Sequence, residues 1–528
     1  MKNSILIITL ALIALFTGCQ ELEIENPNNP NQEDVLNNAG SLKNLAGSVF
    51  QNWYLNNVGY DETPAFMLGT AADATSSSWG NFAMRDMSYE PRKAWNNNPS
   101  YVNAPMTESY YDNMYSLLSM CNDVLHAIKT NPELEFTSES EKNMIKAVAK
   151  LGQGISLGYI GLIFDKGFIV KEDDDPTEEF ELESYQEVVD AAIISINEAI
   201  DIASLNYFEI PEEWINGVTM DNLRFYRLAN FMAAKILLSE PRTQAENEEV
   251  ERWEKIRDYL YDNEIDPVTK VEYKGLTQDY TITADKNAGS WASLYHFYAT
   301  WTGWSRVDMR VVAMLDTADL PPVWPEEYEG DYTNFPNNGE AVSPDYRLQT
   351  DFQFMVSHYF NPERGYYHFS TYRYRRFDYL RYTGFPGQGE VPLYRKAEND
   401  YMLAEAYVRA ENNWSEAISI LNNSARVLRG GPGMEISPSA SRQEVLDAIF
   451  YERTIELFSN NLGIQYFDMR RFDKLQKGTP LHLPIPGGEL ETLEMPDYTF
   501  GGVANSGMEG TADAGWKEEY ESTLKSTY

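Results

Sequence analysis

Residues 398–428 read ENDYMLAEAYVRAENNWSEAISILNNSARVL, and this stretch decides the fold class. Its apolar residues fall at helical spacing in two stripes: Leu403, Ala404 and Tyr407, then Ala417, Ile418 and Leu421. A turn at residues 412–414 separates the stripes, and Ser415 is a candidate N-cap for the second helix. Because small alanines beside large apolar residues let two helices approach closely, the stretch resembles a tetratricopeptide-type helix pair, although the full consensus is absent.

Helical signals of the same kind recur on both sides of this pair. Residues 107–129 carry a long apolar stripe, and residues 147–163 form an apolar run. Three capping-box patterns each precede such a stripe: Ser138 with Glu141, Ser184 with Glu187, and Ser441 with Glu444. The sequence therefore predicts an all-α fold, with helical scaffold at about 35–262 and 396–490.

Two segments depart from the helical pattern. Residues 263–395 are rich in Pro, Gly, Tyr and Trp, and residues 56–106 are loop-like with many Asn and Ser. Short β-like runs occur in the first segment, as at 366–374. Long irregular segments on a regular scaffold are often functional, so we expect long loop excursions with minor β structure and a binding role for them.

The N-terminus predicts an exported, membrane-anchored protein. Residues 1–18 have a weakly basic start and an apolar stretch too short to span a bilayer, which indicates a signal peptide. Thr17-Gly18-Cys19 resembles a bacterial lipobox, so Cys19 is the expected lipidation site; an ordinary secretory signal cleaved elsewhere is the alternative. Residues 19–34 form a polar tether, and residues 35–528 form one domain with a variable region at about 263–395.

Charge and cysteine content narrow the functional classes. The formal net charge is −39, which repels nucleic acid and anionic lipid. With Cys19 lipidated, Cys121 is the one remaining cysteine, and its place in an apolar stripe predicts an inert, buried thiol.

Several segments resemble one family, the SusD/RagB nutrient-uptake lipoproteins. The most specific matches are the C-terminal signature, carried by Glu452-Arg453, Glu456-Leu457 and residues 466–472 (YFDMRRF), and the Leu483-Pro484-Ile485-Pro486 that follows. Weaker matches are the lipobox and tether, residues 145–170, residues 183–202 and the helix pair at 395–428. The signature's usual final Trp is Phe472 here, and residues 149–161 are unusually Gly-rich.

The resemblance implies a tetratricopeptide-like helical fold and a position on the outer-membrane surface of a Bacteroidetes-type cell. It also implies a partner, a SusC-like TonB-dependent transporter over which the lipoprotein closes. Family ligands are oligosaccharides, and peptides in some branches. Acidic residues after Cys19 resemble the family's surface-export signal.

Motifs for cofactors and covalent catalysis are missing from the sequence. The five histidines show no metal-ligand spacing, and residues 173–176 lack the pattern of a calcium loop. Gly152-Gln153-Gly154 with Gly158 misses the dinucleotide fingerprint, and we interpret Gly154 and Gly158 as helix-packing positions. We expect no metal, no cofactor and no enzymatic activity. A hydrolytic carboxylate pair hidden among 81 acidic residues stays open as an alternative.

Aromatic residues supply the candidate ligand site. Exposed Trp and Tyr rings stack on the apolar faces of sugars while Asn and Arg bind hydroxyls. The residues that combine these types in loop-like settings are Trp79, Asn81, Arg85, Trp95, Asn96, Trp301 and Trp304. Trp291, Tyr295 and Tyr298 fall at helical spacing instead, which predicts burial. Arg470 and Arg471 are expected to brace the scaffold through carboxylate pairs.

These signals favour capture of an extracellular oligosaccharide and its delivery to a transporter. A peptide-binding member of the same family and a surface glycoside hydrolase are the two alternatives.

Overall fold

The computed structural model describes residues 35–60, 62–77, 79–89, 91–175, 177–261, 273–287, 290–317, 340–356 and 370–516. The predicted signal peptide, the lipidation site Cys19 and the tether at 19–34 lie outside these described residues. Within them, no helix is long and apolar enough to cross a membrane.

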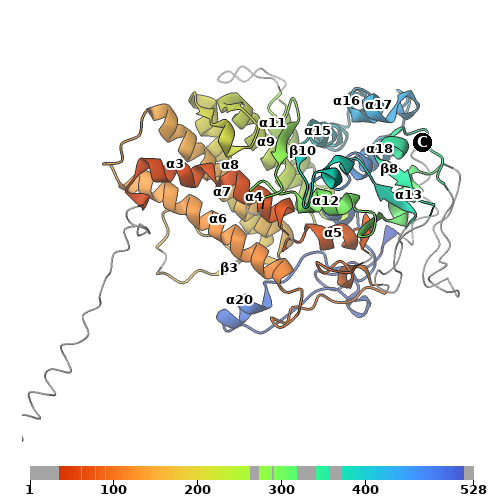
Figure 1. Ribbon diagram of the computed structural model, residues 1–528, viewed down its shortest axis with the longest axis horizontal. Coiled ribbons are helices and arrows are strands. Elements are labelled where there is room, and N and C mark those ends of the chain that lie inside the picture. Colours follow the sequence, from red (N-terminus) through yellow and green to blue (C-terminus); the bar gives the residue numbers. More distant parts are fainter. Residues whose placement is uncertain are drawn as a thin grey trace, which may run out of the picture.

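Helices form most of the described structure (Figure 1). The helices of the first half are α3 (Ala39–Gly47), α4 (Val49–Tyr54), α5 (Ala65–Ala71), α6 (Pro105–Thr130), α7 (Glu139–Ile163), α8 (Tyr185–Leu205), α9 (Asn222–Ser239), α10 (Gln244–Asn247) and α11 (Val250–Leu260). Neighbours in sequence pack in space, since α7 lies against α6 and α8, and α8 against α9.

The second half continues the helical layer. Its helices are α12 (Leu294–Thr300), α13 (Met309–Leu315), α14 (Arg347–Thr350), α15 (Lys396–Ala410), α16 (Trp414–Asn422), α17 (Ala425–Gly430), α18 (Arg442–Ile455), α19 (Ile464–Arg471) and α20 (Gly487–Thr492). The predicted pair appears as α15 and α16, which pack on each other, while α15 also contacts α11 and α18. The N-cap of α16 is Asn413, two residues before the candidate Ser415.

Glycines on α7 allow helices α8 and α9 to pack closely against it. A Cβ on Gly154 would lie 2.3 Å from Ile196 Cγ1 of α8, and one on Gly158 would lie 2.5 Å from Ile236 Cδ1 of α9. Since any larger residue would push these helices apart, the helix-packing interpretation of both glycines is confirmed.

Side chains cap the three helices for which the sequence predicts capping boxes. Ser184 and Ser441 form complete capping boxes with Glu187 and Glu444. Ser138 accepts the backbone N–H of Glu141, but the Glu141 carboxylate bonds Thr137 and Lys43 instead. Two of the three predicted boxes are therefore complete and the third is half formed.

The β structure of the described residues consists of five short antiparallel pairs. They are β1 (Thr75–Ser77) with β7 (Ser305–Val307), β2 (Lys166–Phe168) with β3 (Leu182–Ser184), β4 (Glu209–Ile210) with β5 (Met220–Asp221), β6 (Tyr280–Ala284) with β10 (Gly389–Tyr394), and β8 (Phe352–Phe354) with β9 (Tyr372–Tyr374). Part of the expected β-like run at 366–374 lies outside the described residues, and its end is β9.

The C-terminal signature is buried and ion-paired. Arg471 donates to both oxygens of Glu405 at 2.7 Å and to Asp468 at 2.9 Å, as expected. Arg470 differs, because its guanidinium donates to the backbone carbonyls of Leu162, Leu481 and Ser239. The expected carboxylate pairing of Arg470 is thus wrong: it caps the end of α7, where carbonyls lack helical partners.

Candidate functional site

The β1–β7 pair brings two distant aromatic segments together. Its register places Ser77 opposite Ser305, so the loop that follows β1 meets the loop that precedes β7. The first loop carries Trp79 and Asn81, and the second carries Trp301 and Trp304. Four of the predicted site residues therefore lie at one end of one short sheet.

Rings from three segments pack into one aromatic cluster, which consists of Phe82, Phe297, Tyr298, Trp301, Trp304 and Phe385. Trp304 has its ring centre 5.2 Å from that of Trp301 and 5.4 Å from that of Tyr298. Phe297 lies 5.2 Å from Trp301 and 5.2 Å from Phe385. Phe82 lies 5.7 Å from Tyr298, so the loop after β1 belongs to the same cluster.

The aromatic cluster is buried on one side, which we call its base, and exposed on the other side, which we call its rim. Tyr298 and Phe297 are buried, whereas Trp301 and Trp304 are partly exposed. Trp79 is 56% exposed and Phe385 is 62% exposed. Because the exposed rings are held by the packed base, a ligand can stack on them with only a small loss of side-chain conformational entropy.

Sequence reasoning missed Phe385 and its neighbour Tyr382, which is 78% exposed. Tyr382 ends a short 3-10 helix (Asp378–Tyr382), Phe385 lies in the loop between that helix and β10, and neither belongs to an apolar stripe. The signal that could have revealed them is the aromatic, glycine-rich run at 377–389, the same kind of signal that singled out Trp79. Burial of Trp291, Tyr295 and Tyr298 is confirmed, since each is less than 10% exposed.

Polar contacts tie Asn81 to the base of the cluster. The Tyr298 hydroxyl donates to Asn81 Oδ1 at 2.7 Å and lies 2.9 Å from Ser77 Oγ. Burial raises the pKa of Tyr298, so this hydroxyl keeps its proton at every physiological pH. Asn81 itself is partly exposed.

Cations near the cluster are paired with acid. The Arg381 guanidinium lies 5.5 Å from the Trp301 ring centre, and its Nη1 is 3.5 Å from Asp378. Arg373 holds the same Asp378 through two hydrogen bonds of 2.6 Å. Asp378 is thereby shared by two guanidinium groups, so these three side chains together carry a net positive charge.

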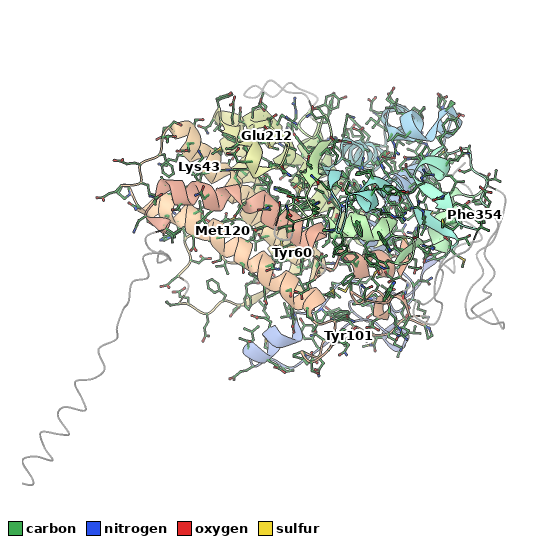
Figure 2. All side chains as sticks on the ribbon, viewed as in Figure 1. Lys43, Tyr60, Tyr101, Met120, Glu212 and Phe354 are labelled. Atoms are coloured by element: carbon green, nitrogen blue, oxygen red, sulfur yellow. The ribbon has the colours of Figure 1, made fainter. Side chains whose placement is uncertain are left out.

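Trp95 is not part of this surface, which corrects the prediction for that residue. Its side chain is only 3% exposed, and its ring packs against Tyr101 at 5.6 Å. Figure 2 places Tyr101 in the lower part of the view. Hydrogen bonds join the Trp95 backbone to Thr499 and Phe500, so the chain's C-terminal segment covers this region.

Asn96 and Arg85 complete the predicted set. Asn96 is exposed, but it follows Trp95 on the segment bound to residues 499–501, and its Oδ1 accepts the backbone N–H of Asn98. Arg85 is partly exposed on the loop after β1, with its guanidinium carbon 6.0 Å from the Tyr89 ring centre. The structure thus gathers Asn81, Trp301 and Trp304 around Tyr298 and leaves Trp79 exposed on the same loop as Asn81. Arg85 lies further along that loop, and Trp95 and Asn96 belong to a separate segment.

Metal-ligating side chains do not gather in the described part of the chain: no group of three or more His, Cys, Asp or Glu residues there could hold an ion. His296 is buried and bonded to Ser293 and the Asn460 carbonyl, and burial lowers its pKa to about 3. It is therefore a neutral core residue. Cys121 is buried as predicted, and burial raises its pKa, which leaves the thiol unreactive.

The fold and this site define a mostly helical, tetratricopeptide-like protein with an aromatic cluster carried on irregular loops. A family model for the SusD family matches residues 250–526, more than half of the 528 residues, so the chain belongs to the SusD family. No match is found among curated proteins.

Solved structures agree with this assignment at the level of the fold. A SusD superfamily protein from Bacteroides thetaiotaomicron is 12% identical with a TM-score of 0.54, covering 85% of this chain and 93% of its own. A SusD-like carbohydrate binding protein from Bacteroides fragilis is 15% identical with a TM-score of 0.54, covering 83% and 86%. A laminarin binding SusD-like protein is 17% identical with a TM-score of 0.50, covering 87% and 99%.

Proposed function

We propose that the chain is a cell-surface lipoprotein that binds an extracellular oligosaccharide and passes it to a SusC-like TonB-dependent transporter. Trp79, Trp301 and Trp304 stack on sugar faces, and Asn81 bonds to a sugar oxygen, with Arg85 as a further donor at the margin. The observation that carries the proposal is the exposed rim of the aromatic cluster beside the Asn81 amide. Two of the similar structures bear names that describe carbohydrate or laminarin binding.

The exposed indole rings beside the Asn81 amide favour a glycan over the alternatives, because such rings stack on the apolar faces of sugars. A hydrolase would need two carboxyl groups facing the sugar, and Asp378 is held in ion pairs. We propose capture without cleavage, and both alternatives remain outcomes of the test.

The test is a screen of soluble protein, starting after Cys19, against a panel of glycans and peptides. We expect glycan retention without release of product. Trp79→Ala and Trp304→Ala should each weaken binding about tenfold, because each removes a stacking face. Trp414→Ala is the matched control, since Trp414 is 37% exposed but lies at the start of α16.

Retention of peptides alone would replace the glycan proposal, and product release by the purified protein would replace capture with hydrolysis. Equal losses from Trp414→Ala and Trp79→Ala would remove the aromatic cluster from the binding role.

The anchor and the partner need a separate experiment. Cys19→Ser should move the full-length protein from the membrane fraction to the soluble fraction. Affinity purification of the wild-type protein from outer membranes should bring a TonB-dependent transporter with it, and its absence would contradict the delivery step.

A further inference from the structure

The hydrogen bonds at the base of the aromatic cluster form a chain in which every donor points the same way. The backbone N–H of Gly80 donates to Ser77 Oγ at 3.1 Å. Tyr298 gives its single proton to Asn81 Oδ1 at 2.7 Å, so the 2.9 Å contact between Ser77 Oγ and the Tyr298 hydroxyl must use the serine proton. Every proton in the chain therefore points toward the Asn81 carbonyl oxygen, and such directed chains polarise their members.

This direction fixes which end of the Asn81 amide faces outward. Because Oδ1 is turned inward to Tyr298, the Nδ2 amino group with its two N–H donors is at the other end of the planar amide. Asn81 is partly exposed, and those donors lie at the end of the amide turned away from Tyr298. A ligand group at Asn81 must then be an acceptor oxygen.

The backbone next to Asn81 has an unfavourable conformation that contacts with neighbouring residues must hold. Phe82 and Ala83 are consecutive non-glycine residues with left-handed φ values of +53° and +56°. Such residues are rare and cost free energy unless surrounding contacts hold them, and they concentrate at functional sites. Phe82 is held by ring contacts to Phe66 at 4.7 Å and to Tyr298 at 5.7 Å.

Tyr298 joins both restraints. Its hydroxyl bonds Asn81 and Ser77, and its ring contacts Phe82 and Trp304. It is 3% exposed, so it lies beneath the surface that a ligand would touch.

We propose that Tyr298 is a positioning residue that holds the 79–85 loop in its left-handed conformation and orients Asn81 as a hydrogen-bond donor toward the ligand. The ligand consequence rests on the proposed glycan function. The positioning itself is a property of the free protein, so it is testable with no ligand present.

The experiment is amide hydrogen exchange on the ligand-free protein, read from peptides that cover residues 79–88. Tyr298→Phe keeps the ring and removes only the hydroxyl. We expect exchange in this loop to become at least about fivefold faster, because two buried hydrogen bonds are lost. Tyr295→Phe is the matched control: it lies on the same helix, its ring contacts Phe66 at 5.4 Å, and its hydroxyl lies near Gly69 of α5.

Two substitutions at Asn81 test the hydrogen bond that it accepts from Tyr298. Asn81→Asp keeps an acceptor for Tyr298, so loop exchange should stay at the wild-type rate. Asn81→Leu removes one of the two hydrogen bonds and should speed exchange less than Tyr298→Phe does. The double variant should match Tyr298→Phe alone, because the Tyr298–Asn81 bond cannot be lost twice.

Equal exchange in Tyr298→Phe and Tyr295→Phe would overturn the positioning role. Fast exchange in Asn81→Asp would show that an acceptor oxygen at this position does not hold the loop, and would overturn the role of the Tyr298–Asn81 hydrogen bond. A glycan screen without binders, together with the expected exchange pattern, would overturn the proposed function alone.

Discussion

At the scale of single residues, buried ion pairs help to hold the described core together. Burial by itself raises the pKa of the Glu405 carboxyl, but the charges of Arg471 and Arg409 outweigh it and lower the pKa to about 2. Glu456 follows the same logic, with Arg376, Arg429 and Arg347 lowering its pKa to about 2. Both carboxylates therefore stay charged while fully enclosed.

Glu405→Gln should lower the free energy of unfolding by about 3 to 5 kcal/mol, because it leaves buried guanidinium charge without its partner. The measurement is chemical unfolding at pH 7, followed by circular dichroism. Asp173→Asn is the control, since the Lys129–Asp173 pair is exposed and its loss should be immeasurable. An equally small effect of Glu405→Gln on the free energy of unfolding would contradict a stabilising role for the Glu405–Arg471 ion pair.

At the scale of elements, α7 is the helix on which the N-terminal layer depends. It contacts α6, α8 and α9, and its glycines remove the side chains that would keep them apart. A Cβ on Gly154 would also meet the Ala192 backbone oxygen at 2.9 Å, which cannot move without shifting α8.

Gly154→Ala should therefore destabilise the protein by about 1 to 2 kcal/mol, since the clash outweighs a gain in helix propensity of about 1 kcal/mol. The shift in the thermal midpoint measures the loss. Gly303→Ala should leave the midpoint unchanged, because a Cβ there would meet nothing within 4 Å. A raised thermal midpoint for Gly154→Ala would show that α8 can shift to make room for the added methyl group without loss of stability.

At the scale of the whole molecule, two opposing sets of carboxyl groups set the response to pH. Burial raises the pKa of Asp165, Glu240, Asp400 and Asp447, so the folded state takes up these protons more readily than the unfolded state. Glu405 and Glu456 have lowered values, so their contribution is complete above the unfolded pKa and is lost as pH falls toward 2.

The protein should be more stable in mildly acidic solution than at pH 7. As pH falls from 7, protons bind the first set and relieve repulsion from the net charge of −39. Below about pH 4.5 the second set is lost and stability should fall steeply. Thermal midpoints from pH 3 to 8 at constant ionic strength test this, and a steady rise up to pH 8 would contradict it.

The fold also joins chain segments that are far apart. Asp73, just before β1, accepts hydrogen bonds from Arg92 Nη2 at 2.6 Å and from Trp516 Nε1 at 2.8 Å. The C-terminal segment thus fixes the base of the loop that carries Trp79 and Asn81. The site is a property of the assembled molecule rather than of any one segment.

The sequence by itself determined the helical class, the α15–α16 pair, two complete capping boxes, the packing glycines of α7 and the burial of Cys121, Trp291, Tyr295 and Tyr298. These features follow from local periodicity, which is written within a few turns of chain. It also named Trp301 and Trp304 of the aromatic cluster, and Trp79 and Asn81 on the loop beside it.

Only the tertiary structure decided which aromatic rings are exposed. Trp79 and Trp95 stand in similar loop-like sequence, yet residues 499–501 cover the segment of Trp95 and leave Trp79 open. Phe385 and Tyr298 join the cluster through contacts across more than 80 residues, and Arg470 finds carbonyls rather than carboxylates more than 200 residues away. Such contacts depend on which segments the packed scaffold brings together, and no local pattern encodes that choice.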